Sequence, residues 1–479
     1  MSLKSKALNG VKWTSISTVL NASIQLLQIS ILARYLDKGD FGLWAIIMLI
    51  IGFSQMFVDF GISSAIIHKQ STTNEQLSTL YWLNILMSLI IYGIIVLLSP
   101  FIANFYNEVT LTNLINLTAI IVVIQSFGKQ YFVLFEKNLQ FNILAKIDIA
   151  SNLIGFMLAI LLAIYGYGVY SLIYPTILVV ALKSLLYIIN GIKYHRPKFI
   201  FALKDVKEYI RFGVFLLGSD MVNYFNSQFD VIVIGKVFGN ETLGMYSIIK
   251  QLVMRPAQII NPIITRVTFP TMSKVQNDTE KLKNIYLKTI NYLLSVNFPI
   301  YIAMIILAPE IITIFLGEKW LEAVEIFQLL SIYALIRSTG NPMGSLILAK
   351  GKSDYAFYWN IGLFFIIPIT IYTGSFYGIE AVVWSMVGLQ IFLKYFGWRF
   401  LVNKLCGAGL VEYLMEIFKP LFIASISGLI AYLSLYILKS DMIILNIITV
   451  CIVELIFVVL LNILFNKEFA KTILSMAKI

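Results

Sequence analysis

The stretch LARYLDKGDFGLWAII, which begins at Leu32, has a counterpart in IGKVFGNETLGMYSII, which begins 202 residues later at Ile234. At this offset Gly42 falls on Gly244, and two isoleucines and a basic residue also coincide. With small gaps the match continues downstream, where LLSP falls on ILAP. Shared apolar composition does not explain glycine, proline and charge matches at a nearly constant offset. We therefore predict that the chain contains an internal duplication.

Composition places this duplicated chain in a lipid bilayer. Of its 479 residues, 59% are hydrophobic and only 13% are charged, and the mean hydropathy is +0.86. Soluble domains are roughly half apolar and about a quarter charged. Apolar runs of about twenty residues, the length that spans the hydrocarbon as a helix, recur from Trp13 to Phe465. We predict an all-α polytopic membrane protein. Its fourteen transmembrane helices are expected at 13–36, 41–66, 80–104, 110–132, 146–165, 168–191, 210–235, 243–268, 288–308, 325–349, 357–374, 378–402, 414–437 and 442–465.

Lysines and arginines orient the predicted spans. The formal net charge is +11, and if both termini are cytoplasmic, most of the basic residues outside the spans fall on the cytoplasmic side. The opposite side receives only Arg34, Lys38, Lys236, Lys319 and Lys439. An excess of basic residues in cytoplasmic loops sets membrane topology, so both termini are predicted to be cytoplasmic. Because topology explains the positive charge, a nucleic-acid partner is not expected.

Each predicted repeat contains six helices. An even number gives both halves the same orientation, so a pseudo-two-fold axis along the membrane normal relates them, as in the parallel repeats of transporters. We expect an N-lobe at 1–204, a C-lobe at 205–405 and two C-terminal helices at 406–479 that lie outside the repeat. In this plan the substrate binds between the lobes, near the middle of the membrane.

Charged residues deep in the predicted spans are the candidate site. A charge at the centre of a span costs about 2.5–3.5 kcal/mol, so a retained charge generally lines a water-filled cavity or has a partner. In RPAQIINPIITRVTFP (255–270), depth places Arg255 near mid-membrane and Arg266 toward the cytoplasmic end, and the prolines predict a bent helix. Arg337 falls mid-span in LIRSTGNPMGS, where glycine and proline predict an interrupted helix.

Two explanations for these charges remain open. In the first, Arg255 and Arg337, with Arg266, Lys394 and Lys183 as secondary members, form a cationic cavity that receives an anion. Arginine suits this role because its guanidinium group binds phosphate oxygens in a bidentate manner. In the second, ion pairs with acidic residues hold the two halves together. Lys183 and Lys394 could also extend to the cytoplasmic interface.

The acidic residues and the outer ends of the spans have comparable alternatives. Asp220 and Asp230 are candidates for binding a coupling ion, or for acting as counter-ions to the arginines. Arg34 and Lys236 stand at outer ends that the repeat relates, where they form either a gate or solvated helix ends. Glu454, outside the repeat, is interpreted as a packing or lipid-side partner.

Several kinds of chemistry have no support in the sequence. Cys406 and Cys451 are too few for a disulfide framework or a zinc site. His68 and His195 fall in basic loops, where no chemical role is expected. There is no Walker lysine loop, GxGxxG fingerprint, GxSxG elbow or HExxH motif in a suitable place. We predict that the protein is not an enzyme and uses no cofactor or metal. The driving force is then a gradient of substrate, or of H+ or Na+.

Five stretches spread over both repeats carry a family resemblance. They are VDFGISSAIIHKQ (58–70), TLYWLN (79–84), NPIITRVTFPTMSKVQNDTEKLK (261–283), FLGEKW (315–320) and IRSTGNPMGSLILAK (336–350). With its predicted fourteen helices and six-plus-six repeat, the chain resembles the multidrug/oligosaccharidyl-lipid/polysaccharide flippase superfamily. Within it, the chain is similar to the Wzx-type polysaccharide flippases, and in particular to the colanic-acid exporters.

The resemblance implies a function. It implies translocation of undecaprenyl-pyrophosphate-linked oligosaccharide repeat units across the bacterial cytoplasmic (inner) membrane, for export of a capsule, exopolysaccharide or O-antigen, by alternating access coupled to H+ or Na+. The last two helices would help form a groove for the polyprenyl tail. The lipid bilayer, a polysaccharide polymerase and export machinery are the implied partners. Alternatives are a cation-coupled multidrug antiporter of the same fold, a flippase for another lipid-linked precursor (teichuronic acid or peptidoglycan), and a polysaccharide-assembly enzyme or scaffold.

Overall fold

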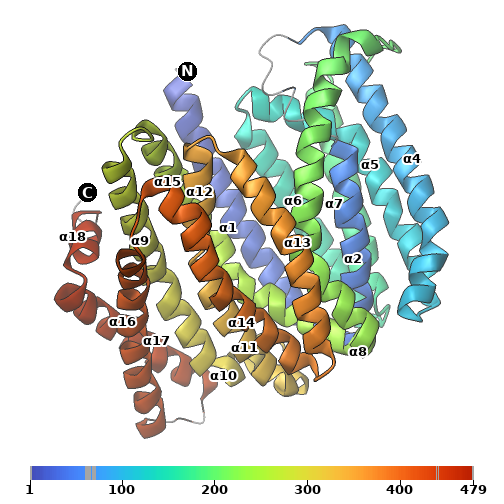
Figure 1. The fold of residues 1–479 in the computed structure, drawn as a ribbon. Coiled ribbons are helices and arrows are strands. Elements are labelled where there is room, and N and C mark those ends of the chain that lie inside the picture. Colours follow the sequence, from blue (N-terminus) through green and yellow to red (C-terminus); the bar gives the residue numbers. More distant parts are fainter. Residues whose placement is uncertain (1–2, 60–65, 67–71, 439, 441, 477–479) are drawn as a thin grey trace. The chain divides into compact units, whose positions relative to one another are not determined.

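The computed structural model describes residues 3–59, 66, 72–438, 440 and 442–476, and within these ranges every regular element is helical (Figure 1). The predicted all-α class is confirmed. His68, Lys439 and the end of the span predicted at 41–66 lie outside the described residues. The helices are α1 (Leu3–Tyr35), α2 (Lys38–Asp59), α4 (Asn74–Tyr106), α5 (Thr110–Lys137), α6 (Phe141–Ile164), α7 (Tyr170–Gly191), α8 (Leu203–Lys274), α9 (Thr279–Ile306), α10 (Ala308–Phe315), η1 (Glu318–Ala323), α11 (Val324–Ser338), α12 (Asn341–Ala349), α13 (Ser353–Ser375), α14 (Ile379–Gly397), η2 (Trp398–Val402), α15 (Asn403–Cys406), α16 (Leu410–Ile437), α17 (Ile443–Phe465) and α18 (Lys467–Met476).

Eleven helices in the described part of the chain are long and apolar enough to cross a membrane. The protein is therefore a multi-pass membrane protein. Two of the predicted spans, 210–235 and 243–268, both fall inside α8. The span predicted at 325–349 is divided between α11 and α12, with Gly340 between them, which confirms the interruption that the sequence predicts there.

The long helix α8 contains one break. Gly239 has φ 82° and ψ −178°, and it is the position within α8 where the backbone leaves helical torsion angles. A positive φ of this size favours glycine, which has no Cβ to clash with the preceding carbonyl. Pro256 and Pro262 lie within helical backbone. The stretch 255–270 is thus helical, and the departure from helical geometry comes at the glycine and not at the prolines.

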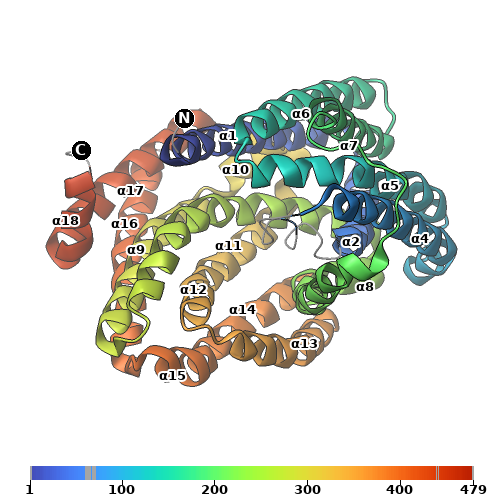
Figure 2. The same cartoon turned by 90° about the horizontal axis from the view of Figure 1, so that it is seen from above.

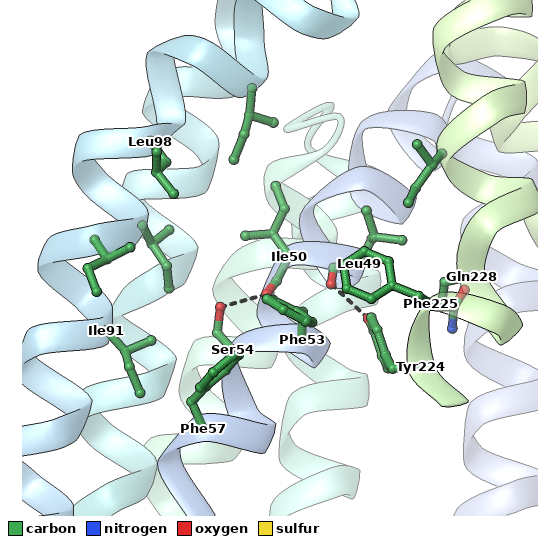
Figure 3. Close-up of a pocket in the computed structure, with 14 residues that line it drawn as sticks. Leu49, Ile50, Phe53, Ser54, Phe57, Ile91, Leu98, Tyr224, Phe225 and Gln228 are labelled. Carbon is green, nitrogen blue, oxygen red and sulfur yellow. Dashed lines mark hydrogen bonds between the residues drawn. The ribbon is translucent and has the colours of Figure 1, made fainter. Parts of the chain in front are cut away.

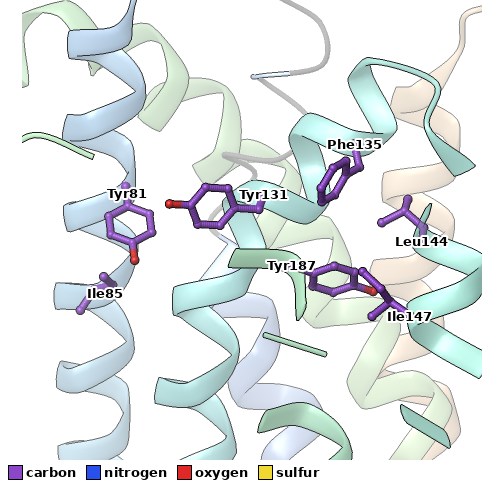
Figure 4. Close-up of a cluster of buried hydrophobic side chains, with 7 residues drawn as sticks. All are labelled: Tyr81, Ile85, Tyr131, Phe135, Leu144, Ile147 and Tyr187. Atoms are coloured by element: carbon purple, nitrogen blue, oxygen red, sulfur yellow. The ribbon is translucent and has the colours of Figure 1, made fainter. Parts of the chain in front are cut away.

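By internal packing the chain divides into two units, Met1–Ser247 and Ile248–Ile479. In the first unit α1 packs against α6, α4 packs against α5, and α7 packs against both α5 and α6. Aromatic and aliphatic side chains from four of these helices form a core cluster (Figure 4). Its members are Tyr81, Ile85, Tyr131, Phe135, Leu144, Ile147 and Tyr187.

In the second unit α9 packs against α11 and α16, α14 packs against α11 and α13, and α16 packs against α17. Figure 2 shows α16 and α17 beside α9, with the short α18 at their end. Trp320, in the short helix η1, is fully buried, as are Phe327 and Tyr301. Within the stretch FLGEKW (315–320), Trp320 and Leu316 are therefore packed into this unit, while Glu318 and Lys319 stay exposed.

The two glycines that the repeat alignment superposes meet at one close approach in the first unit. A Cβ atom on Gly42 would lie only 2.7 Å from the carbonyl carbon of Asn240, with the oxygen nearer still. A Cβ atom on Gly244 would lie 2.7 Å from the nitrogen of Gly42 and 2.9 Å from the carbonyl carbon of Lys38. The start of α2 and the part of α8 that follows Gly239 therefore touch backbone to backbone.

Candidate functional site

Two of the predicted basic residues come together in the second unit, at the gap between α11 and α12. The side chain of Lys394 reaches from α14 until its Nζ atom lies 3.2 Å from the point that a Cβ atom on Gly340 would occupy. The same point is 3.5 Å from the carbonyl oxygen of Arg337. The absence of a side chain at Gly340 makes room for the ammonium group. Lys394 is close enough to Arg337 for their positive charges to repel each other.

Arg337 lies in the last turn of α11 and is exposed. Its Nη1 donates a hydrogen bond of 2.9 Å to the hydroxyl of Tyr333, one helical turn earlier. The guanidinium carbon is 5.9 Å from the centroid of the same ring, within the range of a cation–π contact. Tyr333 therefore helps to hold the guanidinium group in place, through one of that group's five N–H donors and through the tyrosine ring.

Arg255 lies on the part of α8 that belongs to the second unit. Its Nε is buried and has no hydrogen-bond partner among the described atoms. Close to it, Asn297 on α9 donates a 3.0 Å hydrogen bond to Asn261, which fixes α8 against α9. The hydroxyl of Tyr301, one turn further along α9, lies near both the backbone of Ala257 and the charge of Arg337. Tyr301 thus links the Arg255 segment to the basic pair.

The other predicted basic residues each have their own surroundings. Arg266 is exposed on α8, eleven positions beyond Arg255 in the sequence. Lys183, in the first unit, forms a 2.9 Å salt bridge with Asp148 on α6. The hydroxyl of Tyr187 donates a 3.2 Å hydrogen bond to the same carboxylate. Asp148 was not among the predicted site residues, because it stands only two residues inside the span predicted at 146–165 and the depth rule concerns charges near the middle of a span.

The two predicted acidic residues have different surroundings on α8. Asp220 is exposed. Asp230 is 3% exposed, and its carboxylate accepts hydrogen bonds from the backbone N–H of Val231 and from the hydroxyl of Tyr246. Asp230 is therefore held as a hydrogen-bonded group within the first unit. Among the residues searched, no three His, Cys, Asp or Glu side chains gather closely enough to hold a metal ion.

In the first unit, Lys236 on α8 contacts the end of α4. Its Nζ donates a 2.6 Å hydrogen bond to the carbonyl oxygen of Phe105 and lies 5.1 Å from the ring centroid of that residue. A cation at a helix C-terminus interacts favourably with the helix dipole. Arg34 is exposed at the end of α1 and also has an interaction partner.

The first unit also contains an apolar cavity of about 290 Å³ between α2, α4 and α8 (Figure 3). The hydroxyl of Tyr224 donates to the carbonyl oxygen of Leu49, and the hydroxyl of Ser54 donates to that of Ile50. These polar groups are satisfied within the protein, so the cavity presents hydrocarbon to any occupant. It adjoins membrane-spanning helices and has no charged lining.

The fold and the site define a multi-pass, all-helical membrane protein that keeps basic side chains inside its spans, as transporters do. The chain belongs to the family of polysaccharide biosynthesis proteins, whose family profile matches residues 31–325. This finding confirms the resemblance that the five sequence stretches indicated.

Two curated relatives extend the match over almost the whole chain. Teichuronic acid biosynthesis protein TuaB of Bacillus subtilis (strain 168) is 34% identical over 435 residues, covering 90% of this chain and 89% of the relative. Lipopolysaccharide biosynthesis protein WzxC of Escherichia coli (strain K12) is 30% identical over 443 residues, covering 92% and 90%. Among solved structures, the lipid II flippase MurJ in an inward closed conformation has a TM-score of 0.73 at 16% identity, covering 94% of this chain and 99% of that one. At this identity the likeness concerns the fold.

Proposed function

We propose that this protein flips undecaprenyl-pyrophosphate-linked oligosaccharide repeat units across the bacterial cytoplasmic membrane, for export of a surface polysaccharide. Its relatives are named for teichuronic acid and lipopolysaccharide biosynthesis, and both align with about nine-tenths of the chain. A fold shared with a lipid II flippase fits a substrate that has a polar head and a polyprenyl tail. The same fold supports alternating access as the mechanism.

The observation that carries this proposal is the approach of two like charges, Arg337 and Lys394, in the second unit. Placing one charge in a span costs about 2.5–3.5 kcal/mol, and repulsion between two cations adds to that cost where the dielectric constant is low. A bound anion offsets both the cost of placing the charges in the span and the repulsion between them. Pyrophosphate suits the pair because its oxygens accept the charge-assisted hydrogen bonds that arginine and lysine donate. Arg255 extends the same cationic surface along α8, and Arg266 lies toward its cytoplasmic mouth.

The finer architecture is part of the same proposal. We infer fourteen spans, arranged as six helices in an N-lobe (1–204), six in a C-lobe (205–405) and a final pair (406–479), with both termini in the cytoplasm. The approach of α2 to α8 supports a two-fold relation between the repeats, because Gly42 and Gly244 each pack against the other's helix.

The remaining charged candidates are assigned by their surroundings. Asp220 is the stronger candidate for the coupling ion, H+ or Na+, because it is exposed and can exchange with water, whereas Asp230 is already hydrogen-bonded. The charge of Lys183 reaches the substrate only when its pair with Asp148 opens. Arg34 and Lys236 form the outer gate. Flipping requires no bond to be made or broken, so no catalytic residue is proposed, and the polymerase and export machinery act on the flipped product.

Complementation of a strain that lacks its own polysaccharide flippase tests the proposal. Arg337→Ala and Lys394→Met are each expected to lower surface polysaccharide about tenfold to hundredfold, because each removes a charged hydrogen-bond donor worth roughly 1.5–3 kcal/mol. Lys352→Met removes an exposed lysine at the start of α13 and serves as the control, with no loss expected. Normal polysaccharide from both site variants, at wild-type abundance in the membrane, would refute the site.

A further inference from the structure

A polar cavity of about 540 Å³ lies in the second unit, at the end where α9 begins and α17 gives way to α18. Three lysines line it, each from a different helix: Lys288 on α9, Lys419 on α16 and Lys467 on α18. Two glutamates, Glu416 and Glu468, also line it, so the lining carries a net charge of +1. None of these residues belongs to the basic site around Lys394.

A buried amide network fixes the walls of this cavity. The side-chain nitrogen of Asn466, between α17 and α18, donates to Asn291 on α9 at 2.8 Å and to Ser295 at 3.2 Å. Asn291 in turn donates to the carboxylate of Glu416 on α16 at 2.8 Å. Asn291 and Asn466 are 3% and 4% exposed. The network holds three elements in one arrangement, so the lysines project from a rigid frame.

Two of the three lysines are available to a ligand. Lys288 forms a 3.1 Å salt bridge with Glu468, and the carboxylate of Glu416 is occupied by the amide network. Lys419 and Lys467 make no salt bridge within the described part of the chain. With Lys288 and Glu468 paired, Lys419 and Lys467 carry one charge more than the remaining carboxylate, Glu416, and this favours an anionic occupant carrying one net negative charge.

The surroundings of the cavity indicate that this anion is attached to hydrocarbon. Beside it, α16 and α17 expose the apolar side chains of Phe418, Phe422, Leu464 and Phe465, each more than half exposed. Both helices have the length and hydropathy of membrane spans, so these side chains face lipid acyl chains. The following helix, α18, is short and carries Lys467, which is typical of a helix at the membrane interface. Phosphate groups of phospholipids lie in the interfacial region that such helices occupy.

We propose that this cavity binds the phosphodiester headgroup of an anionic phospholipid, with Lys419 and Lys467 contacting the phosphate and the acyl chains lying along α16 and α17. A phosphodiester carries one negative charge, which matches the net charge of the lining. The volume falls in the range of small-molecule sites. This site requires only that the chain spans a membrane, so it stands independently of the transported substrate.

Binding of fluorescent phosphatidylglycerol to the purified full-length protein tests this site. Because each lysine contributes a charge-assisted hydrogen bond to the phosphate, whose loss weakens binding about tenfold or more, the double variant Lys419→Gln/Lys467→Gln is expected to bind at least about thirtyfold more weakly. The variant Lys419→Arg/Lys467→Arg keeps both charges and is expected to bind as wild type. The control Lys352→Gln/Lys471→Gln removes the same charge from exposed positions outside the cavity and is expected to change binding little.

Competition with three unlabelled compounds tells binding of the whole lipid from binding of its headgroup alone. Unlabelled phosphatidylglycerol is expected to displace the probe, whereas phosphatidylcholine, which has no net charge, and soluble glycerol phosphate are not. Equal loss of binding in the glutamine double variant and in the control would mean a general surface attraction and would overturn the site. Displacement by glycerol phosphate at the concentrations that suffice for phosphatidylglycerol would overturn the lipid assignment. Wild-type binding by the glutamine double variant would overturn both.

Discussion

Adding a single methyl group at the contact of α2 with α8 is expected to force the two backbones apart. At Gly42 or Gly244 a Cβ atom would lie 2.7 Å from backbone atoms of the opposite segment, against roughly 3.5–4.0 Å for an ordinary carbon contact. The carbonyl oxygen of Asn240 would be nearer still, so Gly42→Ala requires the two segments to separate by more than about 1 Å. Backbone atoms cannot rotate aside as a side chain does, so we expect a loss of about 3 kcal/mol, the upper end of the range for overpacking.

The two glycines share one contact, so their substitutions should not be additive. Once Gly42→Ala has separated the segments, Gly244→Ala meets less obstruction, and the double variant is expected to lose clearly less stability than the two single losses combined. Unfolding of the purified protein, measured for wild type, both single variants and the double variant, gives this coupling. Gly93→Ala is the matched control, because a Cβ atom at Gly93 meets nothing within 4 Å and alanine favours a helix. If Gly42→Ala were as stable as Gly93→Ala, the close backbone contact would not be part of the folded protein.

Three further predictions concern other contacts. Burial lowers the pKa of His195 below its ordinary value of 6.5, so the unfolded chain takes up a proton first as the pH falls. The free energy of unfolding should therefore decrease below about pH 6.5 in wild type and less in His195→Gln, and equal pH profiles from parallel unfolding titrations would count against this. Asp148→Asn leaves Lys183 charged, partly buried and without its salt bridge. We expect a loss of about 2 kcal/mol, which lies between the losses for breaking an exposed and a buried salt bridge. A double variant with Lys183→Met should regain stability in the same assay. Gly428→Ala would drive a Cβ atom into the Cγ2 methyl group of Ile302 and cost about 1–2 kcal/mol. Ile302→Ala removes that methyl group, so the double variant should lose less stability than the two single losses combined, and additive losses would contradict this packing.

Hydropathy predicted the long apolar helices because a run of about twenty apolar residues is enough by itself to place a helix in lipid. The span predicted at 442–465 corresponds to α17 at Ile443–Phe465, and the interruption predicted near Gly340 separates α11 from α12. The form of α8 was not predictable in the same way. One backbone torsion at Gly239 breaks it, whereas three prolines lie within its helical backbone.

The site was predictable as a set of residues but not as a geometry. Depth alone singled out Arg337 and Lys394, which lie 57 positions apart in the sequence. The two residues meet at Gly340 because of how α14 is rotated against α11. Side-chain packing between the helices sets this rotation, and it produces no periodic pattern in the sequence. The salt bridge of Lys183 with Asp148 was not predicted for a different reason, because Asp148 stands near the start of the span predicted at 146–165, where depth does not single out a charge.

Flipping by the purified protein in liposomes tests the central claim most directly. A fluorescent undecaprenyl-pyrophosphate-linked oligosaccharide is placed in both leaflets, and a membrane-impermeant quencher reports how fast the inner pool reaches the outer leaflet. Wild-type protein is expected to make the inner pool accessible much faster than in protein-free liposomes, and Arg337→Ala to slow this exchange about tenfold or more. An exchange rate equal to that of protein-free liposomes, from protein that is folded and inserted, would contradict the account.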